Sequence, residues 1–344
     1  MKTKLTLLSL LALAGMAFAA PFPLRRPVGL IEPDIPIDQP LTTEVVALGK
    51  RLFFDPRLSA SGRTSCSSCH DPVAGFADSR RLSLKDNGSS TARHAPSVLN
   101  AGYLPTTMWD GKYRTLEQQV FDTFKPNGDM GHYVGDAVTA IASDPEYQRL
   151  FDRAFQAGAS ADRMATAIAQ FERSLVSGDS PFDKHIFLRD KSALTDEQKL
   201  GLKVFSSKAG CLNCHDVFHP DFNPLGGGSA LFTDFRFHNL GVGYKAGRFG
   251  DTGRFTITRD PADVGAFRTP SLRNVAERAP YMHDGSLATL EEVIDFYNKG
   301  GNANPNLSPS MRPLYLTAEE KRLLVVFLKA LSDPSAKKAA GRAD

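Results

Sequence analysis

The sequence predicts an all-α fold with long loops and little strand, and three observations lead to this class. Apolar residues recur at helical spacing in several separate segments along the 344 residues. Helix-start signals stand in front of several of those segments. Alternation of apolar and polar residues, the pattern of a half-buried strand, is weak throughout. A chain of this length also suggests about two domains.

The first predicted helix follows a proline-rich stretch, residues 21–40, which we expect to be an extended arm on the surface. Thr43-Glu44 begins the helix, and the chain is expected to leave it near Asp55-Pro56. The apolar face is formed by residues at helical spacing, namely Val45, Leu48, Leu52 and Phe53.

A second helix of the same kind begins at a capping box, with Thr195 as N-cap and Gln198 three residues on. Both helices contain the pattern Leu-Gly-x-x-x-Phe, from Leu48 to Phe53 and from Leu200 to Phe205. A glycine lets another helix approach closely, and the aromatic side chain packs on that contact. We interpret the pattern as an internal repeat of two similar units, although a pattern this short also arises by chance.

Further helices are expected between and after these two. Asp144-Pro145 begins one, Thr317 to Glu320 begins the last, and a break is expected from Ser177 to Pro181. Residues 218–259 predict a long loop with a small hairpin, of the kind that lines a functional site. The remaining apolar faces are Tyr147, Leu150, Phe151 and Phe155; Met164, Ile168, Phe171 and Leu175; Leu290, Val293, Ile294 and Tyr297; and Leu323, Leu324, Phe327, Leu328 and Leu331.

The N-terminus predicts a cleavable export signal. Lys2 and Lys4 precede an apolar run from Leu5 to Phe18, and Ala17-Phe18-Ala19 is a cleavage site that would start the mature chain at Ala20. The run is too short for a membrane span, which needs about 20 residues. We therefore expect a periplasmic protein without a membrane span. The net charge of +3 gives no argument for nucleic acid as a partner.

All four cysteines lie in two Cys-x-x-Cys-His motifs, Cys66 to His70 and Cys211 to His215. This motif is the signature of covalent c-type haem attachment. The thiols of Cys66 and Cys69, and those of Cys211 and Cys214, would bond to the porphyrins, while His70 and His215 would each bind an iron. A redox Cys-x-x-Cys and half of a zinc site are the alternative interpretations. Export favours haem, because c-type haem is attached outside the bacterial cytoplasm.

The sixth coordination position of each iron decides between electron transfer and catalysis. Two strong axial ligands give an electron carrier, whereas an open position lets peroxide or oxygen bind. Spacing alone does not assign the sixth ligands. The candidates are His94, His132, His185, His219, His238, Met282, His283 and Tyr297.

Further stretches carry a resemblance to a known family. They are Ala95-Pro96-Ser97-Val98-Leu99-Asn100, Met108-Trp109-Asp110-Gly111, Phe267 to Asn274, and Ala279 to Gly285. Together with the two haem motifs, they resemble the bacterial dihaem cytochrome c peroxidase and MauG family over nearly all of the mature chain. The resemblance implies two cytochrome c-like haem domains, which we place at residues 20–185 and 186–335, after a signal at 1–19 and before a disordered tail at 336–344.

The resemblance also implies roles for residues near the first haem. Trp109, the only tryptophan, would lie between the haems and pass electrons; a buried core aromatic is the alternative. Gln119 and Asp129 would face the peroxide site. The family usually has glutamate where this chain has Asp129, and the shorter side chain would need a bridging water to transfer a proton.

At the second haem the resemblance places Tyr297 in the sixth position, as in MauG-like members, where peroxidases that take electrons from a small cytochrome usually have methionine. A phenolate is a hard, anionic ligand that favours Fe(III) and lowers the reduction potential. Tyr297 also lies on the apolar face of its helix, so a plain core position is the alternative.

The resemblance also implies a calcium site and contacts to the haem propionates. A calcium ion between the domains would take the side chain at position 94 and the backbone carbonyls of Arg278 and Pro280. His94 stands where the family has asparagine, and imidazole is a poor calcium ligand. Arg268 and Arg273 would contact haem propionates, with surface positions as the alternative.

The expected function is that of a periplasmic dihaem c-type peroxidase of the MauG-like branch. Hydrogen peroxide would react opposite His70, and electrons would come from a small donor protein, a cytochrome c or a cupredoxin, or from a protein substrate. A homodimer is also common in the family. The alternative is a dihaem electron-transfer cytochrome without catalysis, in which both irons have two protein ligands.

Overall fold

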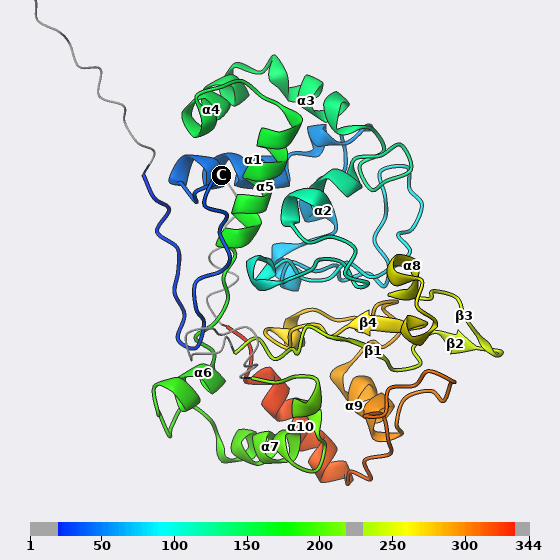
Figure 1. Ribbon diagram of the computed structural model, residues 1–344. Coiled ribbons are helices and arrows are strands. Elements are labelled where there is room, and N and C mark those ends of the chain that lie inside the picture. The colour runs from blue at the N-terminus through cyan, green and yellow to red at the C-terminus, as the bar shows by residue number, and fades with distance from the viewer. Residues whose placement is uncertain (1–19, 218–229, 334–344) are drawn as a thin grey trace, which may run out of the picture.

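The computed structural model describes residues 20–217 and 230–333 (Figure 1). This part of the chain is mostly helical with little strand, as the sequence predicts. The expected export signal, the tail at 336–344, His219 and residues 218–229 of the predicted loop lie outside the described residues. None of the helices in the described ranges is long and apolar enough to cross a membrane.

The first half of the structure is built around two crossing helices, α1 (Thr43–Phe54) and α5 (Ala161–Ser174). Around them lie α2 (Leu116–Thr123), α3 (Val134–Ala142) and α4 (Pro145–Phe155), of which α2 and α3 were not expected. Side-chain oxygens of Thr42 and Asp144 cap α1 and α4, which confirms the predicted helix starts. The apolar faces of these helices share one hydrophobic cluster.

The second half is built around α7 (Asp196–Ser206) and α10 (Ala318–Lys329), with α6 (Pro181–Phe187) and α9 (Leu290–Asn298) beside them. Thr195 and Thr317 form capping boxes at the starts that the sequence predicts. A second hydrophobic cluster fills this half. Phe182 of α6 belongs to it and packs against Phe232 and Phe327, although Phe182 precedes the expected boundary at 185. The chain therefore passes between clusters in the break at 177–181.

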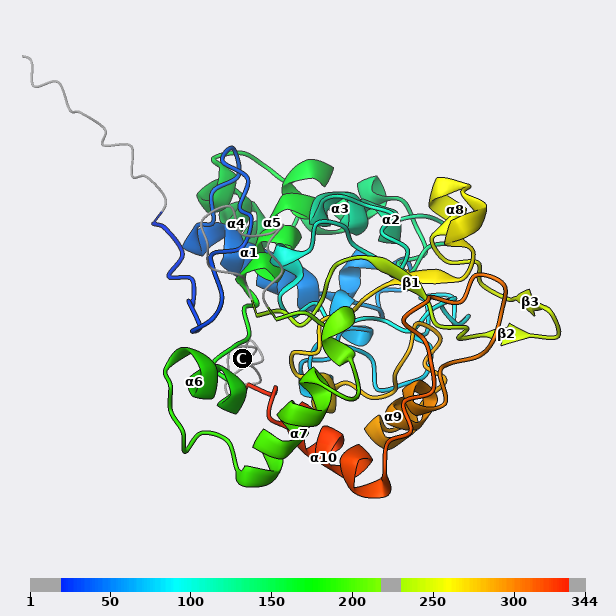
Figure 2. The ribbon, with the colours of Figure 1, turned by 60° about the horizontal axis from the view of Figure 1, so that its bottom comes forward.

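The strands are short. β1 (Phe237–Asn239) pairs antiparallel with β4 (Ala266–Arg268), and Figures 1 and 2 both show this pair between the two halves. β2 (Tyr244–Lys245) and β3 (Arg248–Phe249) form the small hairpin expected in the long loop. The one-turn helix α8 (Phe255–Thr258) follows the hairpin and was not expected.

Each half is held by a close helix crossing at the glycine of the Leu-Gly-x-x-x-Phe pattern. A Cβ atom on Gly49 would lie 1.8 Å from the carbonyl oxygen of Ala167 in α5, and one on Gly201 would lie 2.1 Å from that of Leu323 in α10. The aromatic partners are equivalent too. Phe53 lies 5.2 Å from Phe171, and Phe205 lies 5.1 Å from Phe327, between ring centroids. The predicted repeat is therefore a structural one.

The repeat continues beyond the predicted pattern. Met108-Trp109-Asp110-Gly111 and Met282-His283-Asp284-Gly285 stand 174 positions apart, and in each the methionine has a positive φ, 65° and 73°. Thr115 and Thr289, at the same spacing, cap α2 and α9. These two helices are therefore equivalent in the two halves.

The contact between the halves is reciprocal. The backbone N–H of His94 donates to the carbonyl of His283, and the backbone N–H of Arg268 donates to the carbonyl of Trp109, both at 2.8 Å. His94 and Arg268 occupy equivalent positions, each two residues before a Pro-Ser pair. Each half thus binds the Met-x-Asp-Gly turn of the other through the same segment, as in an isologous interface.

Replacing Gly201 with alanine should lower the free energy of unfolding by about 1–3 kcal/mol or more, because the added methyl meets a backbone carbonyl that cannot move aside cheaply. Gly135→Ala in α3 is the matched control, since nothing lies within 4 Å of its Cβ position. That variant should be neutral or slightly stabilised. Chemical denaturation compares the two, and equal effects would contradict the role of the crossing.

Candidate haem sites

Both Cys-x-x-Cys-His motifs have the same local structure. Cys66–Ser68 and Cys211–Asn213 form single 3₁₀ turns, and each following histidine is fixed by a backbone carbonyl. His70 Nδ1 lies 3.2 Å from the carbonyl oxygen of Phe76, and His215 Nδ1 lies 2.9 Å from that of Phe232. Donation from Nδ1–H leaves the Nε2 lone pair free to bind a metal. Burial lowers the pKa of His215 to about 4 and also lowers that of His70, which favours this neutral form.

The second motif opens onto a cavity of about 210 Å³. Its wall contains the motif residues Cys211, Cys214 and His215, and also Tyr297 of α9. Most of the lining is apolar, as haem requires. The Tyr297 hydroxyl makes no hydrogen bond with any described residue, and burial raises its pKa. The residues present therefore fit a haem with Tyr297 beside it.

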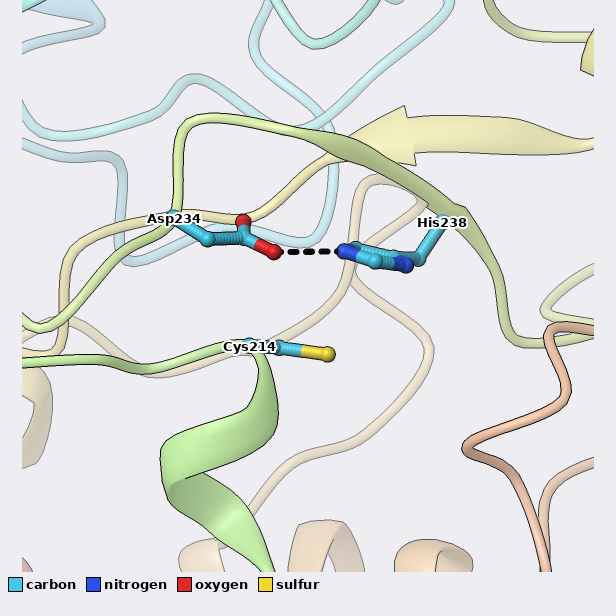
Figure 3. Close-up of side chains that lie close together, drawn as sticks. All are labelled: Cys214, Asp234 and His238. Carbon is cyan, nitrogen blue, oxygen red and sulfur yellow. Dashed lines mark hydrogen bonds and ion pairs between the residues drawn. The ribbon is translucent and has the colours of Figure 1, made fainter. Parts of the chain in front are cut away.

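Cys214, Asp234 and His238 cluster at the edge of this cavity (Figure 3). His238 Nε2 lies 2.7 Å from Asp234 Oδ2, and this hydrogen bond raises the pKa of His238. Because Cys214 belongs to the haem motif, we assign the cluster to the haem site rather than to a separate metal ion. Asp78 is the residue equivalent to Asp234, and it pairs with Arg80 at 2.7 Å.

The predicted residues of the first site lie on α2 and in the loop after it. Burial raises the pKa of the Cys66 and Cys69 thiols, and the charge of Asp129 adds to both shifts. Burial also raises the pKa of Asp129 itself. Gln119 is partly buried on α2, and its side chain makes no hydrogen bond within the described ranges.

The internal repeat identifies the residues of the first half that are equivalent to Tyr297 and its neighbours in the second half. Val293 and Tyr297 of α9 line the second cavity, and the residues 174 positions earlier on α2 are Gln119 and Thr123. The Thr123 hydroxyl donates to the carbonyl of Val120 at 2.7 Å. The Thr123 side chain is short and neutral, and its hydroxyl already bonds to its own helix. The equivalent of the tyrosine position thus offers no strong iron ligand in the first half.

The other candidate sixth ligands are engaged elsewhere or lie in the second cavity. His132 bonds the carbonyl of Leu58 at 2.6 Å and exposed His185 bonds that of Asp190 at 3.0 Å. His94 lies 3.2 Å from the carbonyl of Arg80, and His283 stacks on Phe267 with centroids 3.5 Å apart. His94, His238, Met282 and His283 all line the second cavity. None of these contacts joins one of these residues to the side chain of His70.

Trp109 lies at the reciprocal contact between the halves. Its Nε1–H donates to the carbonyl of His94 at 2.9 Å, and its ring lies edge-on to His283, 6.5 Å between centroids. Trp109 also lines the second cavity. Trp109 therefore contacts segments of both halves.

Comparisons with known proteins agree with this geometry. The family model for di-haem cytochrome c peroxidase matches residues 43–192. The methylamine utilization protein MauG of Methylorubrum extorquens is 39% identical over 315 residues, covering 91% of this chain and 84% of that protein. The chain belongs to the dihaem cytochrome c peroxidase and MauG family. It is therefore an oxidoreductase of cytochrome c peroxidase type.

Two further members of the dihaem peroxidase family are similar over almost the whole chain. Cytochrome-c peroxidase IdrP1 of Pseudomonas sp. strain SCT is 35% identical, covering 95% of this chain and 91% of that protein. The crystal structure of a MauG-like protein associated with microbial copper homeostasis superposes with a TM-score of 0.82 at 35% identity. The superposition covers 91% of this chain and 96% of that one.

In this family member the arginines expected at propionates differ in their surroundings. Arg273 donates to both carboxylate oxygens of Asp183 at 2.7 Å, and its Nε–H donates to the carbonyl of Ala230 at 2.7 Å. Its donors are thus engaged within the protein. Arg268 lines the cavity and has only long contacts, to the carbonyls of Met108 at 3.4 Å and Thr269 at 3.5 Å. Arg278 also lines this cavity, although only its backbone carbonyl was expected to have a role, as a calcium ligand.

The residues expected at calcium come together but do not fit the ion. His94, Arg278 and Pro280 all line the cavity. Burial lowers the pKa of His94, so its side chain is a neutral imidazole. No carboxylate belongs to the part of the cavity wall that the structure describes. Calcium prefers six to eight oxygen ligands, among them carboxylates.

Arg273→Ala should lower the free energy of unfolding by about 3–5 kcal/mol, because it leaves the fully buried Asp183 carboxylate unpaired. The double variant Arg273→Met/Asp183→Asn should recover most of that loss, because the amide is uncharged and its oxygen still accepts from Ser180. Arg322→Ala, which breaks exposed ion pairs to Glu197 and Glu319, is the control and should cost less than about 1 kcal/mol. Denaturant unfolding measures all three, and a double variant as unstable as the single one would refute the pairing.

Proposed function

We propose that the chain carries two covalently bound haem c groups in two cytochrome c-like units, which meet in the break at 177–181 rather than after residue 185. The attachment residues are Cys66, Cys69, Cys211 and Cys214, with His70 and His215 as axial ligands and Arg268 at a propionate. The haems supply an iron that reacts with hydrogen peroxide and a second iron that exchanges electrons. The chain would act as a periplasmic peroxidase of the MauG-like branch.

The difference between α2 and α9 carries this proposal. The second cavity has a phenol, Tyr297, where the first site has Thr123 with its hydroxyl bonded to its own helix. An iron bound by His70 would keep its opposite face open to a small molecule, and an iron bound by His215 would have a second protein ligand. One open and one closed iron is the arrangement of a catalyst coupled to an electron carrier.

Asp129 and Gln119 supply the polar groups at the open face. The buried carboxyl of Asp129 has a raised pKa, which brings it nearer to neutral pH and suits it to pass a proton between the two oxygens of peroxide. That transfer would let the outer oxygen of peroxide leave as water, with the two electrons for breaking the O–O bond supplied by the haem when it is bound. The Gln119 amide would hold the peroxide by hydrogen bonds. Because Asp129 is shorter than glutamate, a water would bridge it to peroxide.

Trp109 would pass electrons between the two irons, since it touches segments of both halves. Reduction would come from a small cytochrome c or a cupredoxin, or from a side chain of a protein substrate oxidised at long range. Tyr297 favours the second route, because a phenolate ligand disfavours the ferrous state that a simple electron donor would fill.

Asp129→Asn should reduce the second-order rate constant for reaction with peroxide by about 10²–10⁴, because the proton donor is lost. Asp129→Glu should retain the rate, and Asp152→Asn, an exposed acid on α4, is the control. Stopped-flow absorbance of the diferric protein gives the rate. Two low-spin irons with no response to peroxide would instead support a dihaem electron-transfer cytochrome.

Tyr297→Met should raise the reduction potential of the second haem and leave the first unchanged, because a neutral sulfur replaces an anionic oxygen. Tyr315→Phe, at a residue that is 81% exposed, is the control. Spectroelectrochemical titration resolves the two haems. A second-haem potential that does not move would rule out Tyr297 as a ligand.

A further inference from the structure

The cavity of the second haem has an unbalanced charge. Among its described lining residues are two guanidinium groups, those of buried Arg268 and half-buried Arg278, and no aspartate or glutamate. Arg312 also reaches the lining but is exposed to solvent. A buried cation without a counter-ion is costly, so the cavity is built to receive an anionic group.

Arg268 shows the imbalance most directly. Only 6% of the residue is exposed, and it forms no ion pair with the described part of the chain. Its two contacts, at 3.4 and 3.5 Å, are too long to satisfy a guanidinium. Arg273, a few residues along, has two oxygens of Asp183 at 2.7 Å. Arg273 is thus paired with an acid inside the protein, whereas Arg268 leaves its charge for a ligand to balance.

Arg278 is the second cation of this cavity without an acidic partner in the described ranges. Its guanidinium donates to the carbonyl of Ser271. Arg278 lines the same cavity as Arg268 and the haem ligand His215, and as His94 and Pro280, where calcium was expected.

We propose that Arg268 and Arg278 together bind a carboxylate of the second haem, and that the Arg278 guanidinium supplies the positive charge between the halves in place of a calcium ion. This inference rests on the proposed function, because the second haem provides the carboxylate. Haem propionates are carboxylates, and a planar guanidinium binds such a group through two parallel hydrogen bonds.

The same charges argue against calcium. A calcium ion at the carbonyls of Arg278 and Pro280 would lie beside a fixed guanidinium, with the neutral imidazole of His94 as its side-chain ligand. Its repulsion by Arg278 would not be offset by any carboxylate of the described cavity wall. One arginine side chain thus replaces a divalent ion that needs at least six oxygens.

The test uses the exported protein with its haem attached, and haem content per chain is measured first. Two haems per chain are required by the proposed function; one or none would refute that function rather than the arginine site. Calcium is then measured by elemental analysis, and thermal unfolding is compared with EGTA and with added calcium. We expect less than one calcium in ten chains and no shift in unfolding with either addition.

Arg278→Gln should shift the potential of the second haem to lower values and leave the first haem in place, because a cation near the iron favours Fe(II). Arg278→Lys keeps the charge and should keep most of the potential. Arg312→Gln, at the exposed rim of the same cavity, should change neither haem. Stoichiometric calcium whose removal alters the second haem, or equal potentials in Arg278→Gln and Arg312→Gln, would overturn the proposal.

Discussion

The reciprocal pair of backbone hydrogen bonds between the halves is the constraint on which the rest of the structure depends. His94 binds the turn that contains His283, and Arg268 binds the turn that contains Trp109. Each turn is followed by the helix that faces its own haem motif, α2 or α9. Together with the Arg93–Asp251 ion pair and the bonds from Arg254 to the carbonyls of Asp110 and Gly111, this pair holds the halves together and places Trp109 at their interface.

Function in this molecule comes from differences between equivalent positions. The shared framework includes the glycine crossings, the capped helices α2 and α9, and a carbonyl on each axial histidine. On that framework Trp109 is matched by His283, and Thr123 by Tyr297. The same backbone geometry can then present an open iron in one half and a ligated iron in the other, since only side chains change.

The sequence predicted the helix starts, the glycine crossings and the hairpin well, because caps and close contacts depend on few local residues. It missed α2, α3, α6 and α8, which have between four and nine residues each and so offer few positions for a helical period. The repeat of Met-x-Asp-Gly was visible in the sequence and would have paired Tyr297 with Thr123. Partners such as Asp183 for Arg273 were not predictable, since they depend on tertiary contacts between segments 90 residues apart.

The buried charges divide the two haem sites by chemistry. Near the first motif lie two acids, Asp129 and Glu172, and burial raises the pKa of Glu172 to about 8. The residue of α10 equivalent to Glu172 is Leu328, which lines the second cavity. Under the proposed function these two carboxyls would hold protons near the first iron, where breaking an O–O bond consumes them. The described lining of the second cavity has Arg268 and Arg278 and no carboxylate, and electron exchange there would move no proton. A single repeated framework can therefore separate proton chemistry from electron transfer by the sign of the charges buried in each half.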